Sequence, residues 1–191
     1  GEGADQVEAD LAGFLLRMRR GYGRITLKIA MSLDGRTAMA SGESQWITGE
    51  DARADVQRLR AESDLMVTGV GTVLADDCRL TLRPDELPLD EDAKDRALAH
   101  PPARMVLDSK GRTPAGAQIL EGGQTTVVTA ANVAPGETVH TVALAADAEG
   151  RVDIGDWVQY LGEQAFNDIM VEAGPTLSGA LLRGGWVDRL I

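Results

Sequence analysis

The segment NDIMVEAGPTLSGALLRGG, residues 167–185, decides the fold. It predicts a buried strand over residues 167–174, followed by a helix with Pro175 at its first position and Gly184-Gly185 at its end. The same alternation predicts further strands over residues 24–31, 64–69, 103–109 and 125–130, and a weaker one over 138–144. Short buried strands that alternate with helices are typical of parallel sheets. We therefore expect an α/β fold with a mostly parallel central sheet flanked by helices.

The spacing of apolar residues predicts two long helices before the middle of the chain. An amphipathic helix is expected over residues 4–20, with an apolar stripe made of Val7, Leu11, Phe14, Leu15 and Met18. A second helix is expected over residues 49–62, where Thr48 and Asp51 match a capping box. Its inner stripe would consist of Ala52, Val56, Leu59 and Ser63, and its polar stripe of Arg53, Gln57 and Arg60.

The remaining elements are shorter. Residues 69–77 predict a short helix or turn, and a helix is expected over residues 155–165. Residues 84–102 contain four prolines and many acidic residues, which indicates a surface excursion with one helical turn. Residues 186–191 predict the beginning of another apolar strand.

Composition narrows the classes of function. The chain has 191 residues, of which 43% are hydrophobic, and its 19 basic and 30 acidic residues give a net charge of −11. This charge argues against general nucleic-acid binding, whereas a small anionic ligand needs only a local group of cations and backbone N–H donors. No apolar run reaches the roughly 20 residues of a membrane helix. The single cysteine, Cys78, excludes an internal disulfide framework and makes the cytoplasm the expected location.

The most informative candidate site is the turn between the strand and the helix of the opening segment. A helix that begins with Gly174, Pro175, Thr176 and Ser178 after a parallel strand exposes unpaired N–H groups, which suit a pyrophosphate. A tight turn without a ligand is the more frequent cause of a Gly-Pro pair. Glu172 precedes this turn at the carboxyl end of the strand, where open α/β sheets bind ligands.

Three weaker patterns could contribute to the same site. Gly69-Val70-Gly71-Thr72 follows a strand but lacks the third glycine of a dinucleotide fingerprint. The loop of residues 41–48 holds Ser44, Gln45 and Trp46, and its tryptophan could stack on a flat ring or anchor the loop in the core. Arg53, Arg60, Arg79 and Arg83 are candidate cations; Arg60 and Arg83 could clamp a phosphate or be ordinary surface charges.

Other chemistry receives little support. Asp76 and Asp77 could bind a ribose or cap a turn. His100 and His140 have no metal-ligand spacing around them, and no metal is expected. Cys78 has no paired histidine motif, and no G-x-S-x-G is present.

Five ordered strings resemble one known family. They are LKIAMSLDGRTAMASGESQWIT (27–48), DVQRLRAESD (55–64), GVGTVLADDCRLTLR (69–83), VLDSKGR (106–112) and VEAGPTLSGALL (171–182). Together they resemble the reductase-domain family of bacterial bifunctional riboflavin-biosynthesis proteins, RibD. The resemblance covers residues 24–191 and implies a dihydrofolate-reductase-like fold. Residues 1–23 resemble the segment that leaves the deaminase domain of that family, although the H-x-E and P-C-x-x-C motifs of that domain are missing.

The resemblance implies an NADPH-dependent reduction of 5-amino-6-(5-phosphoribosylamino)uracil in riboflavin biosynthesis. The residues that it assigns to the cofactor are Ala30, Trp46, Thr72, Asp76, Ser109, Gly174, Pro175, Thr176, Leu177, Ser178, Gly179 and Ala180. Those that it assigns to the phosphorylated pyrimidine are Ser44, Arg60, Leu80, Arg83 and Glu172. Lys28 and Glu172 are the catalytic candidates. Ser109, Lys110 and Arg112 form a group of donors after a strand end, which suits the 2′-phosphate of NADPH.

Two other functions remain open. The related reductase that acts on a 2,5-diaminopyrimidinone differs only in the pyrimidine ring of its substrate. A non-catalytic assembly or regulatory domain is the second possibility, because the family continues past Ile191 with further strands that would complete the sheet. The family also implies a homodimer and a deaminase domain or partner.

Overall fold

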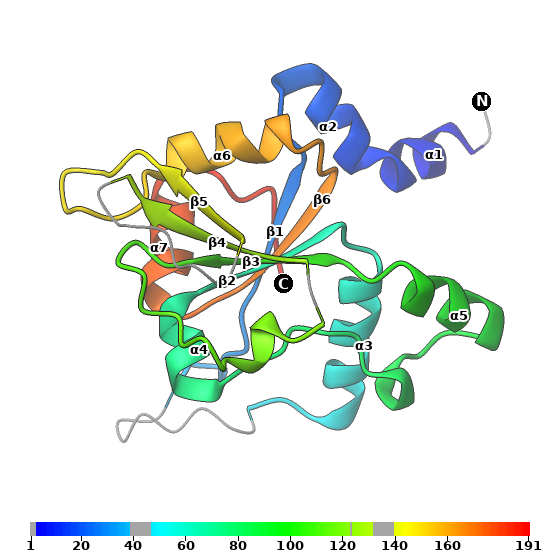
Figure 1. Ribbon diagram of the computed structural model, residues 1–191. Helices are drawn as coiled ribbons and strands as arrows, with labels where there is room; N and C mark the ends of the chain where they lie inside the picture. The colour runs from blue at the N-terminus through cyan, green and yellow to red at the C-terminus, as the bar shows by residue number, and fades with distance from the viewer. Residues whose placement is uncertain (1–2, 39–46, 123, 132–139) are drawn as a thin grey trace.

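The computed structural model describes residues 3–38, 47–122, 124–131 and 140–191. A seven-stranded sheet forms its centre, in the order β5-β4-β3-β2-β6-β1-β7, and every strand pair in it is parallel (Figure 1). The strands are β1 (Arg24–Lys28), β2 (Leu65–Gly69), β3 (Ala103–Leu107), β4 (Thr125–Ala130), β5 (His140–Leu144), β6 (Asp168–Glu172) and β7 (Arg189–Leu190). The predicted α/β class with a parallel sheet is therefore confirmed.

Helices cover both faces of the sheet. They are α1 (Ala4–Asp10), α2 (Ala12–Arg20), α3 (Glu50–Ala61), α4 (Val70–Asp76), α5 (Glu91–Ala99), α6 (Ile154–Glu163) and α7 (Pro175–Arg183), with short 3-10 helices η1 (Pro84–Glu86) and η2 (Gln118–Leu120). Figure 1 shows α6 on one side of the sheet and α3 and α4 on the other. None of the described helices is long and apolar enough to cross a membrane.

Each face of the sheet has its own core, because alternate strand residues point to opposite sides. On one side Ile25, Val67 and Met105 pack with residues of α6 and α7, where Trp157 donates its indole N–H to the Met105 sulfur at 3.1 Å. On the other side Met66 and Val106 pack with α3 and α4. Full burial of such side chains contributes about 1.5–3 kcal/mol each. The strands are held from both sides, which fixes the positions of their ends.

The N-terminal segment differs from its prediction. One helix was expected over residues 4–20, but the helix is interrupted at Leu11, so α1 and α2 are separate. The predicted apolar stripe is also largely exposed; α2 approaches the sheet through Gly13 instead. A Cβ at Gly13 would collide with the carbonyl oxygen of Asn167, so only glycine permits this close approach.

The orientation of α3 agrees only in part with its prediction: Val56 and Leu59 of the expected inner stripe do pack in the core. Gly49 is the N-cap and no side chain caps the helix, so the Thr48–Asp51 capping box was wrong. Gln57 and Arg60 of the expected polar stripe are buried, whereas Ala52 of the expected inner stripe is exposed. The reason is that the polar residues have partners inside: Gln57 Oε1 accepts a hydrogen bond from Arg83 N at 3.0 Å.

The excursion of residues 84–102 contains more helix than expected. Instead of one helical turn it holds η1 and the nine-residue helix α5. Asp90 caps α5, because its carboxylate accepts a hydrogen bond from Ala93 N at 2.8 Å. No residue of α5 is buried, which agrees with the expected surface position.

Candidate functional site

A cleft of about 1450 Å³ lies where β1, β2, β3 and β6 end. β2 to β5 extend from one side of β6, and β1 and β7 lie on its other side, so the cleft is at the topological switch point of the sheet. Open α/β sheets bind their ligands at this position. The volume exceeds the roughly 300–1,000 Å³ of typical pockets for one small ligand. The cleft therefore has room for two molecules.

The cleft is locally basic although the chain is acidic. Among the described residues, seven basic and four acidic side chains line it, an excess of three positive charges, against the net charge of −11 for the whole chain. The basic residues are Lys28, Arg60, Arg79, Arg83, Lys110, Arg112 and Arg151, and the acidic ones are Asp76, Asp77, Asp147 and Glu172. Lys28, Lys110 and Arg112 have no hydrogen-bond or ion-pair partner in the described parts of the chain. These free cations suit an anionic ligand.

The start of α7 offers further donors to the cleft. Gly174 is the N-cap, no side chain caps the first turn, and Pro175 has no N–H. Gly174 N donates to Thr72 Oγ1 of α4 at 3.2 Å. The N–H groups of Thr176 and Leu177 have no partner within the described residues, and the helix dipole favours an anion there. The unpaired N–H donors that were expected at this helix start are thus present, and their use for a phosphate stays a prediction.

Lys28 and Glu172 are direct neighbours across β1 and β6. They are register partners of two parallel strands, so their side chains leave the sheet on the same face. The Glu172 carboxylate is held by Arg60: Arg60 Nε lies 2.6 Å from Oε1, and Nη2 lies 3.0 Å from Oε2. Side-chain exposure is only 10% for Arg60 and 14% for Glu172. A free ammonium and a fixed carboxylate therefore face the same part of the cleft.

Arg60 and Arg83 do not form an open phosphate clamp in this structure. Arg60 is committed to Glu172, and its Nη1 also donates to the carbonyl oxygen of Thr81 at 3.1 Å. Arg83 is exposed and pairs with Glu86 at 2.9 Å. Arg83 alone can turn toward a ligand, because its ion pair is a surface pair of low stability.

The segment of residues 77–80 borders the cleft in an unusual backbone conformation. Asp77 and Leu80 have φ values of 43° and 53°, which non-glycine residues rarely adopt. The Asp77 carboxylate accepts hydrogen bonds from Gln118 N at 2.9 Å and Gln118 Nε2 at 2.8 Å, and these bonds lower its pKa. Asp77 therefore stabilises a turn, while Asp76 stays exposed at the cleft. Strained backbone of this kind is common beside ligand sites.

The loop after β3 forms another wall of the cleft. It carries Ser109, Lys110 and Arg112. Ser109 Oγ accepts a hydrogen bond from Val152 N at 3.0 Å, so its hydroxyl hydrogen is left to donate elsewhere. Arg151 lies on the same wall, where Asp147 and Glu149 bind its guanidinium.

Cys78 lines the cleft but is poorly suited to nucleophilic chemistry. Burial raises the pKa of its thiol to about 11, and the Asp76 carboxylate adds to the shift. The thiol is therefore protonated at neutral pH. Within the described residues, no group of three or more His, Cys, Asp or Glu side chains is placed to hold a metal ion.

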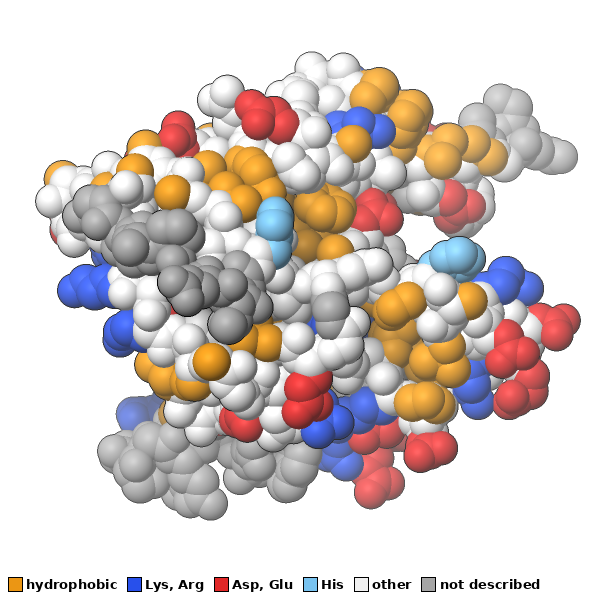
Figure 2. All heavy atoms as spheres, in the orientation of Figure 1, with side chains coloured by type: hydrophobic (Ala, Val, Ile, Leu, Met, Phe, Trp, Pro, Cys, Tyr) orange, Lys and Arg blue, Asp and Glu red, His pale blue; other side chains and the backbone are white. Residues whose placement is uncertain are grey.

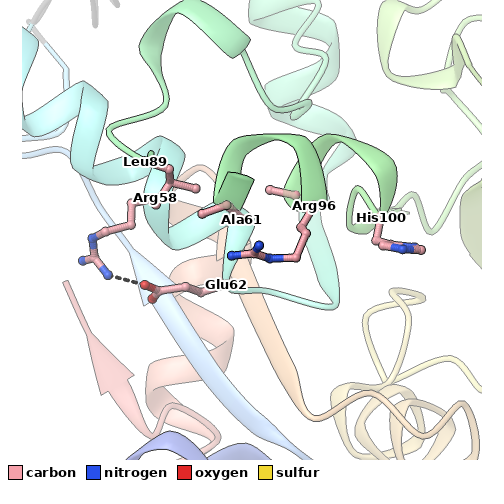
Figure 3. A pocket seen from close by; sticks show the side chains of 8 residues that line it. Arg58, Ala61, Glu62, Leu89, Arg96 and His100 are labelled. Carbon is pink, nitrogen blue, oxygen red and sulfur yellow. Dashed lines mark hydrogen bonds and ion pairs between the residues drawn. The ribbon is translucent and has the colours of Figure 1, made fainter. Parts of the chain in front are cut away.

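A smaller pocket of about 300 Å³ lies between α3 and α5 (Figure 3), and it shares no lining residue with the cleft at the carboxyl ends of the strands. Arg58 of α3 and the C-cap residue Glu62 face it from one side, and Arg96 of α5 and its C-cap His100 line it from the other. Arg58 is already bound to Asp55 and Glu62, and these hydrogen bonds raise its pKa. This pocket lacks the free helix start and paired strand ends of the cleft.

Nearly all residues assigned by sequence lie together. Every described residue of the predicted cofactor, substrate and catalytic sets lines the cleft. Ser44 and Trp46 lie outside the described residues, as does the neighbouring Gln45. Sequence reasoning missed Asp147 and Arg151, because DAEGR at 147–151 has the pattern of an ordinary acidic surface turn.

Comparison with known proteins agrees with this geometry. The family model described as the RibD C-terminal domain matches residues 24–191. Riboflavin biosynthesis protein RibD of Escherichia coli is 48% identical over 187 residues, which cover 94% of this chain and 50% of that protein. A solved structure of Acinetobacter baumannii RibD has a TM-score of 0.80 and 38% identity, with coverage of 97% of this chain and 49% of the other. The chain thus spans about half the length of these relatives.

A shorter relative matches over most of its own length. It is the 2,5-diamino-6-ribosylamino-4(3H)-pyrimidinone 5′-phosphate reductase of Archaeoglobus fulgidus, 36% identical over 170 residues, which cover 87% of this chain and 77% of that protein. The dihydrofolate-reductase-like fold that the resemblance implies is the fold of the solved RibD structure. With a family model that matches all of residues 24–191, the chain belongs to the RibD C-terminal domain family.

Proposed function

We propose that this chain is the NADPH-dependent reductase of riboflavin biosynthesis that converts the ribosyl group of 5-amino-6-(5-phosphoribosylamino)uracil into a ribityl group. The observation that carries the proposal is the pair of register neighbours Lys28 and Glu172, placed in one cleft with the uncapped start of α7. Family membership supports the reaction class. The excess of positive charge in the cleft supports two phosphorylated ligands.

The residues of the cleft fit a bound NADPH. The free N–H groups of Thr176 and Leu177 would hold its pyrophosphate. Lys110 and Arg112, with the Ser109 hydroxyl, would hold its 2′-phosphate. When bound there, NADPH supplies a hydride to C1 of the opened ribose.

The protein's own groups manage the protons of this reduction. The ribose ring opens when its oxygen gains a proton and the amine nitrogen loses one, which leaves a C1=N double bond. After hydride reaches C1, the nitrogen takes a proton, so each turnover consumes one NADPH and one proton. The unpaired Lys28 ammonium is the proton donor to the ring oxygen. Glu172, fixed by Arg60, accepts a hydrogen bond from the sugar and orients it.

The substrate's 5′-phosphate requires a cation that can move. Arg83 is the residue that we assign to it, because Arg83 is exposed and its partner Glu86 is a surface residue three positions away. Leu80 would pack on the sugar or base from the strained segment beside Cys78. Arg60 acts on the substrate through Glu172.

The test is an assay of NADPH oxidation with the deaminated ribosylamino-uracil phosphate as substrate. We expect loss of NADPH absorbance that depends on the pyrimidine, and a product heavier by two hydrogens in mass spectrometry. A reaction without the pyrimidine is the control. NADPH binding with no turnover of any pyrimidine would instead favour a non-catalytic assembly or regulatory domain.

The 2,5-diaminopyrimidinone should be tested as a second substrate in the same assay. The relative from Archaeoglobus fulgidus is named for the 2,5-diaminopyrimidinone and matches over 77% of its own length. The two substrates differ at one position of the pyrimidine ring, so the same cleft could reduce either. If kcat/KM were higher for the diaminopyrimidinone than for the uracil compound, the diaminopyrimidinone would be the assigned substrate.

We further propose a companion deaminase domain, a homodimer and a cytoplasmic location. One structural relative, from Thermotoga maritima, is named as both a deaminase and a reductase. The exposed side chains of Val7, Leu11, Phe14 and Met18 form an apolar stripe on α1 and α2, and hydrophobic side chains are visible in this region of Figure 2. Such stripes are commonly covered by another polypeptide surface. Light scattering of the purified chain tests the homodimer.

A further inference from the structure

The side chain of Asp108 is a buried acid that the proposed reaction does not use. It follows β3 directly and is 0% exposed. Asp is almost never fully buried in proteins unless it is paired, because desolvation of the charge is costly. Its oxygen Oδ2 accepts two hydrogen bonds from Thr113, from the backbone N at 2.6 Å and from Oγ1 at 2.7 Å. Both hydrogen bonds come from Thr113, five residues away, which indicates that Asp108 stabilises the local backbone.

The backbone that Asp108 stabilises is the loop of residues 109–112. Asp108 lies at its start and Thr113 at its end, so the two hydrogen bonds join the ends of the loop. The Asp108 carbonyl oxygen also accepts a hydrogen bond from Gly111 N at 3.1 Å, and Gly111 has a φ of 64°. Asp108 N donates to the carbonyl oxygen of Val128 at 2.8 Å, which ties the loop to β4.

Ser109 anchors the other side of the same loop. Its Oγ accepts from Val152 N at 3.0 Å, and its carbonyl oxygen accepts from Ala130 N at 3.3 Å. The loop is thereby held between β4 and the segment before α6. Lys110 and Arg112 project from it as exposed cations that have no partner in the described parts of the chain.

We propose that Asp108 and Thr113 act as a clamp that fixes the loop so that Lys110 and Arg112 are held ready for the 2′-phosphate of a dinucleotide. Asp108 and Thr113 are positioning residues, and they determine specificity for NADPH over NADH. This inference rests on the proposed function, because NADPH is its ligand. The physical reason is preorganisation: donors on a fixed loop lose less conformational entropy when they bind an anion.

The clamp is tested by Thr113→Val, which keeps the shape of the side chain and removes the hydroxyl donor. We expect KM for NADPH to rise about tenfold, because one hydrogen bond to a buried carboxylate is lost. kcat and the KM for NADH should stay within about twofold of their wild-type values, since NADH has no 2′-phosphate for the loop to bind. Thr113→Ser restores the donor and should restore the wild-type preference.

A matched control separates the clamp from simple loss of stability. Thr125 is a buried threonine whose Oγ1 donates to the carbonyl oxygen of Ile119 at 2.7 Å, a bond that involves no residue of the loop. Thr125→Val should lower the melting temperature as Thr113→Val does, but leave the ratio of the two KM values unchanged. Equal changes of both KM values in Thr113→Val, or no change in either, would overturn the clamp.

The experiment also distinguishes failure of the clamp from failure of the proposed function. If the wild-type protein oxidises neither NADPH nor NADH with either pyrimidine, the proposed function fails. The clamp is then judged by calorimetric titration with 2′,5′-ADP and with 5′-AMP. Weaker binding of 2′,5′-ADP alone by Thr113→Val would support the clamp, and unchanged binding would contradict it.

Discussion

Arg60 and Glu172 lie 112 residues apart in sequence and form a two-point ion pair at the cleft, with contacts of 2.6 and 3.0 Å. Both side chains are nearly buried. Removal of one partner of such a pair leaves an uncompensated charge, which typically costs about 3–5 kcal/mol. This relationship makes the pair a determinant of both the fold and the site.

We predict that Arg60→Met and Glu172→Met each lower the free energy of unfolding by about 3 kcal/mol, and that the double variant loses less than the sum of the two. Urea unfolding measures these values. The control is Arg58→Met on the same helix, because Arg58 pairs with Asp55 and Glu62 at the surface and should cost less than about 1 kcal/mol. Additive losses in the double variant would show that the pair is not coupled.

Replacement of the proposed proton donor should affect the rate and spare the fold. Lys28→Met is expected to lower kcat by about 10²–10⁴, the usual contribution of one general acid or base. NADPH affinity should remain within a few-fold, because Lys28 is assigned to the sugar. Steady-state kinetics and NADPH titration measure the two quantities.

The control for this prediction is Lys94→Met. Lys94 lies on α5, pairs with Glu91 and does not line the cleft. It should leave kcat unchanged. If Lys28→Met and Glu172→Gln both kept near wild-type turnover, the assignment of these residues to catalysis would have to be abandoned.

The sequence predicts the sheet well because parallel strands need apolar residues on both faces. An apolar run such as residues 64–69 is too short for a buried helix and fits a strand that is covered on both sides. The orientation of α3 was predicted only in part, because its periodicity was judged by hydropathy alone. Gln57 and Arg60 are buried because their partners, Arg83 and Glu172, come from segments 26 and 112 residues away. Such long-range partners are not visible in the local pattern.

The candidate site was also predictable where it depends on local sequence patterns and not where it depends on long-range contacts. The sequence alone predicts that residues at the ends of β1 and β6 lie close together, because the carboxyl ends of parallel strands share one edge of the sheet. The resemblance to the family assigned Thr72, Ser109 and the start of α7 to the cofactor site. The turn that carries Asp147 and Arg151 was missed, since its place beside Ser109 depends on the order of β3, β4 and β5 in the sheet. The sequence also did not predict that Arg60 pairs with Glu172 and not with a phosphate; only the structure shows this ion pair.

The raised pKa of Cys78 predicts slow modification of its thiol. A pKa of about 11 in place of 9.0 lowers the thiolate fraction near pH 8 about 100-fold. We expect iodoacetamide to label the native protein far more slowly than the urea-unfolded protein, and labelling of the native form to accelerate as the pH rises toward 11. Mass spectrometry of the time course measures both rates.

The same shift gives a pH dependence of stability with a definite sign. The folded state binds the thiol proton more tightly than the unfolded state, so stability from this group is complete below about pH 9 and is lost as the pH rises toward 11. Cys78→Ser should flatten that part of the stability curve. Equal labelling rates in native and unfolded protein would show that the fold does not shield the partly buried thiol in solution.

The last prediction concerns the contact between α6 and the segment that precedes β1. A Cβ added at Gly162 would collide with the carbonyl oxygen of Gly21, a backbone atom that cannot rotate away. Gly162→Ala should therefore lower the free energy of unfolding by about 1–3 kcal/mol, as overpacking does. Gly116→Ala is the matched control, because no heavy atom lies within 4 Å of its added Cβ. It should change stability by less than about 0.5 kcal/mol. An equal effect of the two substitutions in urea unfolding would mean that α6 is not held against Gly21, and that the connection from α2 into β1 is looser than the structure indicates.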